Sequence, residues 1–152
     1  MKYIEIANMT HSGGRSVNIK NIIAVAIGGM VGTWLRYAMY IWFNMDWFPL
    51  STLLVNLLGS LLLGLLTGAA SQILIKEWLK VGLGVGLCGG FTTMSAFSED
   101  AWRLLMNGQM LILVTYVVTS VGLGIALAAT GYLIAKKMLR SNRKAERQVG
   151  RR

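Results

Sequence analysis

Two long stretches of this chain carry no charged residue, which strongly limits what it can fold into. The first runs from Leu50 to Ile75, 26 residues, and the second from Leu104 to Ala135, 32 residues. A helix that crosses the hydrocarbon core of a bilayer needs about 20 mainly apolar residues. Only 14% of all residues are charged, against about 25% in ordinary soluble domains. The sequence therefore predicts an all-α integral membrane protein with one domain.

Four membrane-spanning helices fit the pattern, at about residues 22–43, 50–75, 81–106 and 110–135. Pro49 lies at the start of the second span, where its missing N–H does no harm. The connections are short, so consecutive helices are expected to be antiparallel neighbours. The polar residues 1–21 are expected to form an N-terminal extension rather than a signal peptide, because charges interrupt any apolar core there. Residues 136–152 are expected to form a basic tail.

The third span contains a stretch, Gly89 to Asp100, that is a poor helix. Two glycines open it, and Thr92, Thr93 and further hydroxyl residues follow. In hydrocarbon every unpaired backbone group costs several kcal/mol, so a break must be buried in protein or line a wet path. We therefore expect a broken third helix. Glu99 and Asp100 at its end are expected to be a solvated pair of acids near the interface.

Small or polar residues recur every four positions in each span, and hence on one helix face. They are Gly28, Gly32 and Arg36; Asn56, Ser60, Gly64 and Gly68; Gly82, Gly86 and Gly90; and Tyr116, Ser120, Gly124 and Ala128. Small residues let membrane helices approach closely, so the glycines are interpreted mainly as packing seams. Seams on all four helices also suggest contact with a second subunit, at least in a dimer.

The basic residues are distributed unevenly along the chain. With four spans both termini lie on one side, together with 13 Lys and Arg, while only Arg103 and Arg36 are near the other side. The positive-inside rule then predicts that both termini are cytoplasmic. We expect the protein to lie in the cell membrane. Eight of the 13 are in the tail, which directly follows a span. Attraction to anionic lipid heads explains them more simply than nucleic-acid binding.

Cysteine and histidine usage excludes several kinds of chemistry. Cys88 and His11 are each the only residue of their type, so one chain offers no Cys/His metal site and no Ser-His-Asp triad. An enzyme is not expected. The predicted spans instead offer neutral donors such as the Asn56 amide and several hydroxyls, which suit a small anion that must also leave. Carbonyl oxygens exposed at the helix break would suit a hard cation such as Na⁺.

Three motifs, in order along the chain, resemble those of the fluoride channel family (Fluc, also called CrcB). They are Gly28-Gly29-x-x-Gly32-x-x-x-Arg36-Tyr37, then Ser51-Thr52-Leu53-Leu54-Val55-Asn56-x-x-Gly59-Ser60-x-x-x-Gly64, then Gly86-x-Cys88-Gly89-Gly90-Phe91-Thr92-Thr93-Met94-Ser95-Ala96-Phe97-Ser98-Glu99. The match extends over all four predicted spans.

The resemblance implies a fluoride-selective channel that lets fluoride leave the cytoplasm and so lowers its toxicity. It also implies an antiparallel dimer of dual-topology type with a structural, untransported Na⁺ at its centre, held by carbonyls of Gly89 and Thr92 from each subunit. On the matching positions Arg36 would lie at the vestibule. The residues that would line the fluoride pore are Asn56, Met94, Ser95, Phe97, Tyr116 and Ser120.

Two features depart from the family pattern. Met94 stands where the family has the first of two pore phenylalanines, and the strong Lys/Arg bias is unlike that of members that insert in both orientations. Both features fit a heterodimer with a homologous chain of opposite bias, and a homodimer stays the other candidate. Two other functions stay open: a small four-helix multidrug or cation exporter, which predicts an acid in the first span that this sequence lacks, and a non-transporting scaffold subunit.

Overall fold

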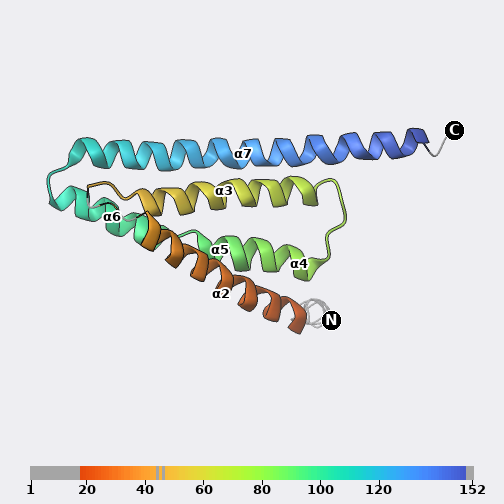
Figure 1. Ribbon diagram of the computed structural model, residues 1–152, viewed down its shortest axis with the longest axis horizontal. Coiled ribbons are helices and arrows are strands. Elements are labelled where there is room, and N and C mark those ends of the chain that lie inside the picture. Colours follow the sequence, from red (N-terminus) through yellow and green to blue (C-terminus); the bar gives the residue numbers. More distant parts are fainter. Residues whose placement is uncertain (1–17, 44, 46, 150–152) are drawn as a thin grey trace, which may run out of the picture.

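The computed structural model describes residues 18–43, 45 and 47–149, and in the last helix the side chains as far as Ser141. Every element in that part of the chain is a helix (Figure 1). Four helical segments are long and apolar enough to cross a membrane, and the third is built from several shorter helices. This confirms the predicted fold class of a multi-pass, all-α membrane protein. Residues 1–17 of the expected N-terminal extension lie outside the described residues.

The first two spans are continuous helices. Helix α2 covers Ile19–Trp42 and begins after Asn18, whose side chain accepts a hydrogen bond from the backbone N–H of Lys20. Helix α3 covers Leu50–Ala70 and begins directly after Pro49. This helix ends five residues before the limit expected from the uncharged run. Residues 71–75 carry no charge, but they form a turn that begins at Ser71.

The third span changes its helical geometry three times. It begins with α4 (Glu77–Val81), continues as a π-helical segment, η1 (Gly82–Cys88), and then as one short turn, α5 (Gly89–Phe91). After two extended residues α6 (Met94–Met106) completes it. π-Helical segments are rare and occur often at functional sites. The third span therefore departs from a plain α-helix well before the break that the sequence predicted.

The last helix, α7 (Met110–Val149), is much longer than a bilayer requires. The turn before it contains Gly108, whose φ of 70° favours glycine. Figure 1 shows α7 running along α3 and continuing past its end. The segment expected as a basic tail thus begins as a direct extension of the spanning helix.

The helices pack mainly in two pairs, α3 with α7 and α2 with the third span. A Cβ added to Gly28 on α2 would overlap the carbonyl oxygen of Gly82, and a Cβ added to Gly64 on α3 would overlap that of Ala128. Backbone atoms cannot give way as flexible side chains can. These glycines therefore let helix backbones touch, which confirms their interpretation as packing seams.

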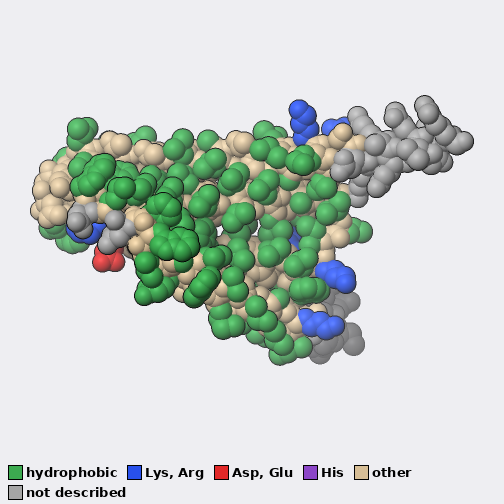
Figure 2. Space-filling view, viewed as in Figure 1, with side chains coloured by type: hydrophobic (Ala, Val, Ile, Leu, Met, Phe, Trp, Pro, Cys, Tyr) green, Lys and Arg blue, Asp and Glu red, His purple; other side chains and the backbone are tan. Residues whose placement is uncertain are grey.

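The surface of the molecule separates apolar from charged residues. Figure 2 shows hydrophobic side chains over most of the visible face, with Lys and Arg near the end that holds the chain termini. The buried core is small and lies toward the opposite end, where Leu53, Leu104 and Tyr116 pack between α3, α6 and α7. This distribution is the one expected of a protein whose sides contact lipid.

Candidate functional site

The break in the third span is confined to two residues. Thr92 (ψ 158°) and Thr93 (φ −149°, ψ 128°) are extended, and Met94 already begins α6. The sequence suggested a poor helix as far as Asp100, and for residues 94–100 this expectation is wrong. The reason is local capping: the Thr93 hydroxyl accepts a hydrogen bond from the Ala96 N–H at 3.2 Å, which starts a new helix at once.

The carboxyl end of α5 is closed by the other threonine. The Thr92 N–H and the Thr92 hydroxyl both donate to the carbonyl oxygen of Cys88, each at 2.9 Å. The two threonines therefore supply side-chain partners on both sides of the interruption. A chain can leave the helix for two residues in a membrane only when its polar groups are paired in this way.

Asn56 of α3 supports the break from the neighbouring helix. Its Oδ1 accepts a hydrogen bond from the Thr93 N–H at 2.9 Å, and its Nδ2 donates to the Thr93 carbonyl at 3.0 Å. In a continuous α-helix the Thr93 N–H would bond to the carbonyl of Gly89. Asn56 thus accepts the hydrogen bond from the Thr93 N–H that the Gly89 carbonyl oxygen would accept in a continuous helix.

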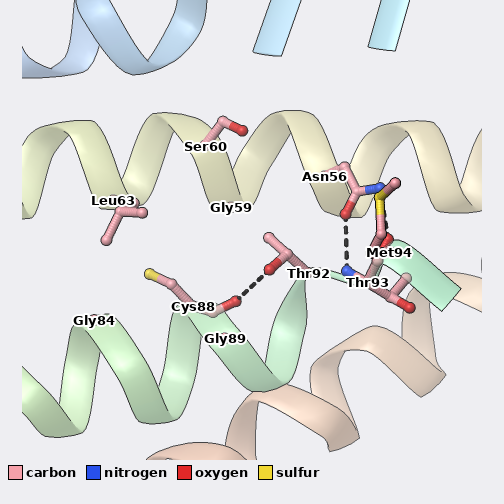
Figure 3. A pocket seen from close by; sticks show the side chains of 10 residues that line it. All are labelled: Asn56, Gly59, Ser60, Leu63, Gly84, Cys88, Gly89, Thr92, Thr93 and Met94. Carbon is pink, nitrogen blue, oxygen red and sulfur yellow. Dashed lines mark hydrogen bonds between the residues drawn. The ribbon is translucent and has the colours of Figure 1, made fainter. Parts of the chain in front are cut away.

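A groove of about 350 Å³ lies between α3 and the broken span (Figure 3). Its lining includes Asn56, Gly89, Thr92 and Met94, so four of the predicted site residues meet there. Met94 is 72% exposed, and a Cβ added to Gly89 would meet no atom within 4 Å. The groove is therefore open, and both residues face away from this subunit's packed interior.

Gly59 lets the break dock closely on α3. A Cβ at this position would overlap the Cγ2 methyl of Thr92 and lie 3.5 Å from the ring of Phe91. The glycine and the Asn56 amide, three residues apart on one helix face, thus fit the broken segment by shape and by hydrogen bonds together.

A second group of predicted residues forms an aromatic cluster between α6 and α7. The rings of Phe97 and Tyr116 lie 5.1 Å apart with an interplanar angle of 32°, and Phe48 meets Tyr116 edge-on at 5.9 Å. Tyr116 is completely buried. Ser120 follows one turn later, and its buried Oγ has no hydrogen-bond partner among the described residues.

Thr93 links Asn56 to Ser95. Its hydroxyl lies 3.1 Å from that of Ser95, while its backbone is held by Asn56. Neither Ser95, Phe97, Tyr116 nor Ser120 lines the groove. No hydrogen bond or ion pair between described residues joins the half-buried Arg36 to either group. The structure thus brings the predicted residues together as two adjoining sets rather than one pocket.

The sequence reasoning missed the role of Asp100. Its side chain is only 16% exposed and pairs with Arg103 at 3.1 Å. Its second oxygen accepts a hydrogen bond from the Tyr116 hydroxyl at 3.4 Å. The expectation of a solvated acid pair is therefore wrong for Asp100, although Glu99 is exposed. The signal available in the sequence was the spacing of Asp100 and Arg103, since residues three apart are neighbours on a helix.

A further polar contact joins the first two spans beside this cluster. The Tyr40 hydroxyl lies 3.4 Å from the hydroxyl of Thr52, which is almost completely buried. Among the described residues no group of three or more His, Cys, Asp or Glu side chains exists that could hold a metal ion.

Asn56→Leu is expected to lower stability, because it keeps the branching of the side chain at Cγ but leaves the Thr93 N–H and carbonyl without partners. An unpaired buried polar group costs about 1–3 kcal/mol. The measurement is the thermal unfolding midpoint of the purified protein in neutral detergent. Thr67→Val is the control, since the Thr67 hydroxyl bonds only within α3, to Leu63. Equal midpoints for the two variants would contradict the proposed role of Asn56.

The chain matches the family model described as CrcB-like protein, Camphor Resistance (CrcB), over residues 23–132. It is 46% identical over 120 residues to a protein of Halalkalibacterium halodurans named Fluoride-specific ion channel FluC 2, and this match covers 79% of this chain and 89% of the relative. A Bacillus subtilis protein of the same name is 42% identical over 115 residues, covering 76% of this chain and 87% of the relative.

A third relative, named Fluoride-specific ion channel FluC, comes from Flavobacterium psychrophilum. It is 40% identical over 124 residues, which cover 79% of this chain and the whole of the relative. The matched regions extend over most of the chain in each case.

Proposed function

This chain belongs to the CrcB-like family of membrane proteins, and we propose that it is a fluoride-selective channel. Its relatives carry the name Fluoride-specific ion channel. Under this proposal it lies in the cell membrane and acts as a channel rather than as an enzyme. Fluoride would leave the cytoplasm passively, driven by the membrane potential, which contributes about 2.3 kcal/mol per charge per 100 mV.

The observation that carries this proposal is the buried hydroxyl of Ser120, one turn from the aromatic cluster, which has no hydrogen-bond partner among the described residues. A buried polar atom without a partner needs an explanation, and a transient anion is a suitable partner for a neutral O–H donor. The edges of the Phe97 and Tyr116 rings carry the positive part of the ring quadrupole. Neutral donors and ring edges can strip a small anion of water without holding it as a fixed cation would.

Asn56, Ser95 and Met94 complete the proposed route on the side of the helix break. Asn56 has one amide hydrogen left after its bond to the Thr93 carbonyl. Ser95 is exposed and shares a hydrogen bond with Thr93. Met94 offers a polarisable side chain but no ring edge. Arg36 is proposed to attract anions at the vestibule.

A structural Na⁺, not itself transported, is proposed at the carbonyls of Gly89 and Thr92. The residues present fit such an ion. In a continuous helix the Thr93 N–H would bond to the Gly89 carbonyl, but here it bonds to Asn56, which leaves the Gly89 oxygen available to a cation. The oxygen donors of the break are the ligand type that hard cations prefer. Two carbonyls from one chain do not complete a coordination shell, so a second subunit would supply the others.

The proposed assembly is an antiparallel dimer in which the open groove of one subunit faces its partner. Exposure of Gly89 and Met94 in that groove supports this arrangement. With 13 of the 15 Lys and Arg residues on the side of the termini, each copy would insert with both termini in the cytoplasm. An antiparallel partner would then be a homologous chain of opposite charge bias. A second copy of this chain is the other candidate, and it requires that some copies insert in the opposite orientation.

Fluoride efflux from proteoliposomes, followed with a fluoride electrode, tests the proposed function. We expect fluoride efflux without chloride efflux, either from this chain alone or only with a homologous chain of opposite bias. Strong flux from this chain alone would exclude an obligatory partner. Absence of selective fluoride flux in both preparations would contradict the channel proposal itself.

Ser120→Ala is expected to lower fluoride efflux by about 10-fold or more, since a hydrogen bond to a charged group contributes about 1.5–3 kcal/mol. The control is Thr115→Val on the same helix, because the Thr115 hydroxyl already bonds to the Leu111 carbonyl at 2.8 Å. Equal efflux from the two variants, at equal reconstituted amounts, would exclude Ser120 from the anion path.

Removal of sodium is expected to weaken the dimer, because the proposed ion joins the two subunits. Sodium itself is expected to carry no current through the protein. Size-exclusion chromatography in sodium buffer and in N-methylglucamine buffer measures the dimer fraction. A dimer equally stable in both buffers, or a sodium current in planar bilayers, would contradict the structural Na⁺.

A further inference from the structure

Three cationic residues lie on one face of α7 directly after its apolar part. Lys136, Lys137 and Arg140 follow the uncharged run that ends at Ala135. At 100° per residue these three positions span only about 100° around the helix. Leu133, which is 61% exposed, lies within the same arc one turn earlier. The face is therefore cationic at one end and apolar at the other.

The depth of this face matches the lipid headgroup layer. With about 1.5 Å of rise per residue, Arg140 lies about 8 Å along the axis beyond Ala135. The headgroup region adds about 5–8 Å to the hydrocarbon core on each side of a bilayer. When the uncharged run occupies the hydrocarbon, the three cations lie at the level of lipid phosphates and Leu133 lies at the level of the acyl chains.

The side chains at this position are arranged for an interface. The Lys136 ammonium lies 5.3 Å from the centroid of the Tyr132 ring, and Tyr and Lys together are typical of the boundary between lipid and water. Among the described side chains, Leu133, Lys136, Lys137, Arg140 and Ser141 line one shallow depression on this face. It thus offers cationic walls above an apolar base.

No carboxylate neutralises these cations within the part of the chain whose side chains are described. The ion pair found there, Asp100–Arg103, belongs to α6. Lys20, Lys76 and Lys80 add positive charge on the side of the termini, where Glu77 is the one described acid. The positive charge of this face is therefore available to an anionic ligand.

We propose that Lys136, Lys137 and Arg140 bind the phosphate group of an anionic phospholipid, whose acyl chain packs on Leu133. The cations directly continue a membrane-spanning helix, which favours a lipid over a nucleic acid. The exposed Leu133 can pack on an acyl chain, whereas the phosphate backbone of a nucleic acid offers it no apolar partner. This site is independent of the proposed fluoride conduction and lies on the outer face of a different helix from the break.

Native mass spectrometry of the full chain in neutral detergent tests this site, with phosphatidylglycerol and phosphatidylcholine as the two lipids. Wild type is expected to retain phosphatidylglycerol preferentially. The triple variant K136Q/K137Q/R140Q is expected to bind it roughly 100-fold more weakly, since each cation near an anionic surface contributes about a fivefold factor. Each variant's thermal midpoint without lipid shows whether it is folded.

The matched control is K20Q/K76Q/K80Q, which removes the same charge from the same side of the membrane but not from α7. It is expected to retain phosphatidylglycerol to within a few-fold of wild type. Equal losses in both triple variants would show that only net charge matters and would overturn the site. Displacement of the lipid by inorganic phosphate, or stronger binding of a short DNA duplex than of phosphatidylglycerol, would also overturn it.

Discussion

The pairing of the Asn56 amide with the backbone of Thr93 is the interaction on which the third span depends. In hydrocarbon each unpaired backbone group costs several kcal/mol, which is enough to forbid an interruption that lacks partners. One side chain supplies an acceptor for the Thr93 N–H and a donor for its carbonyl. Two extended residues can therefore be stable within the membrane, where the backbone would otherwise have to be helical.

Shape holds the break in place as strictly as hydrogen bonding does. On one side the Thr92 methyl fills the space that a side chain at Gly59 would need. On the other side Gly90 packs against the backbone of Gly29, where an added Cβ would lie 2.7 Å from a carbonyl oxygen. The break is thus clamped between α2 and α3, and its orientation relative to the groove is fixed by backbone contacts that leave little room for adjustment.

The fold could be predicted from the sequence because its main determinant, the absence of charge over long runs, is a property of composition. The extent of the break could not, because it depends on which hydroxyl caps which helix end, a matter of three-dimensional geometry. Asp100 shows the same limit: its acidic neighbour Glu99 is exposed, and only the position of Tyr116 on another helix distinguishes the two. Likewise, the charge pattern after Ala135 did not indicate that α7 continues as a helix.

The π-helical segment η1 has a consequence for how this chain can vary. Each residue of a helix advances the direction of its side chains by about 100°, and a π-segment accommodates a different number of residues per turn from an α-helix. Deleting one residue between Gly82 and Cys88 would turn Gly89 and everything after it toward another neighbour. Substitutions in this segment are also restricted, because a Cβ on Gly86 would lie 2.7 Å from the carbonyl oxygen of Val25. The length of the segment is fixed by the direction in which the break must point.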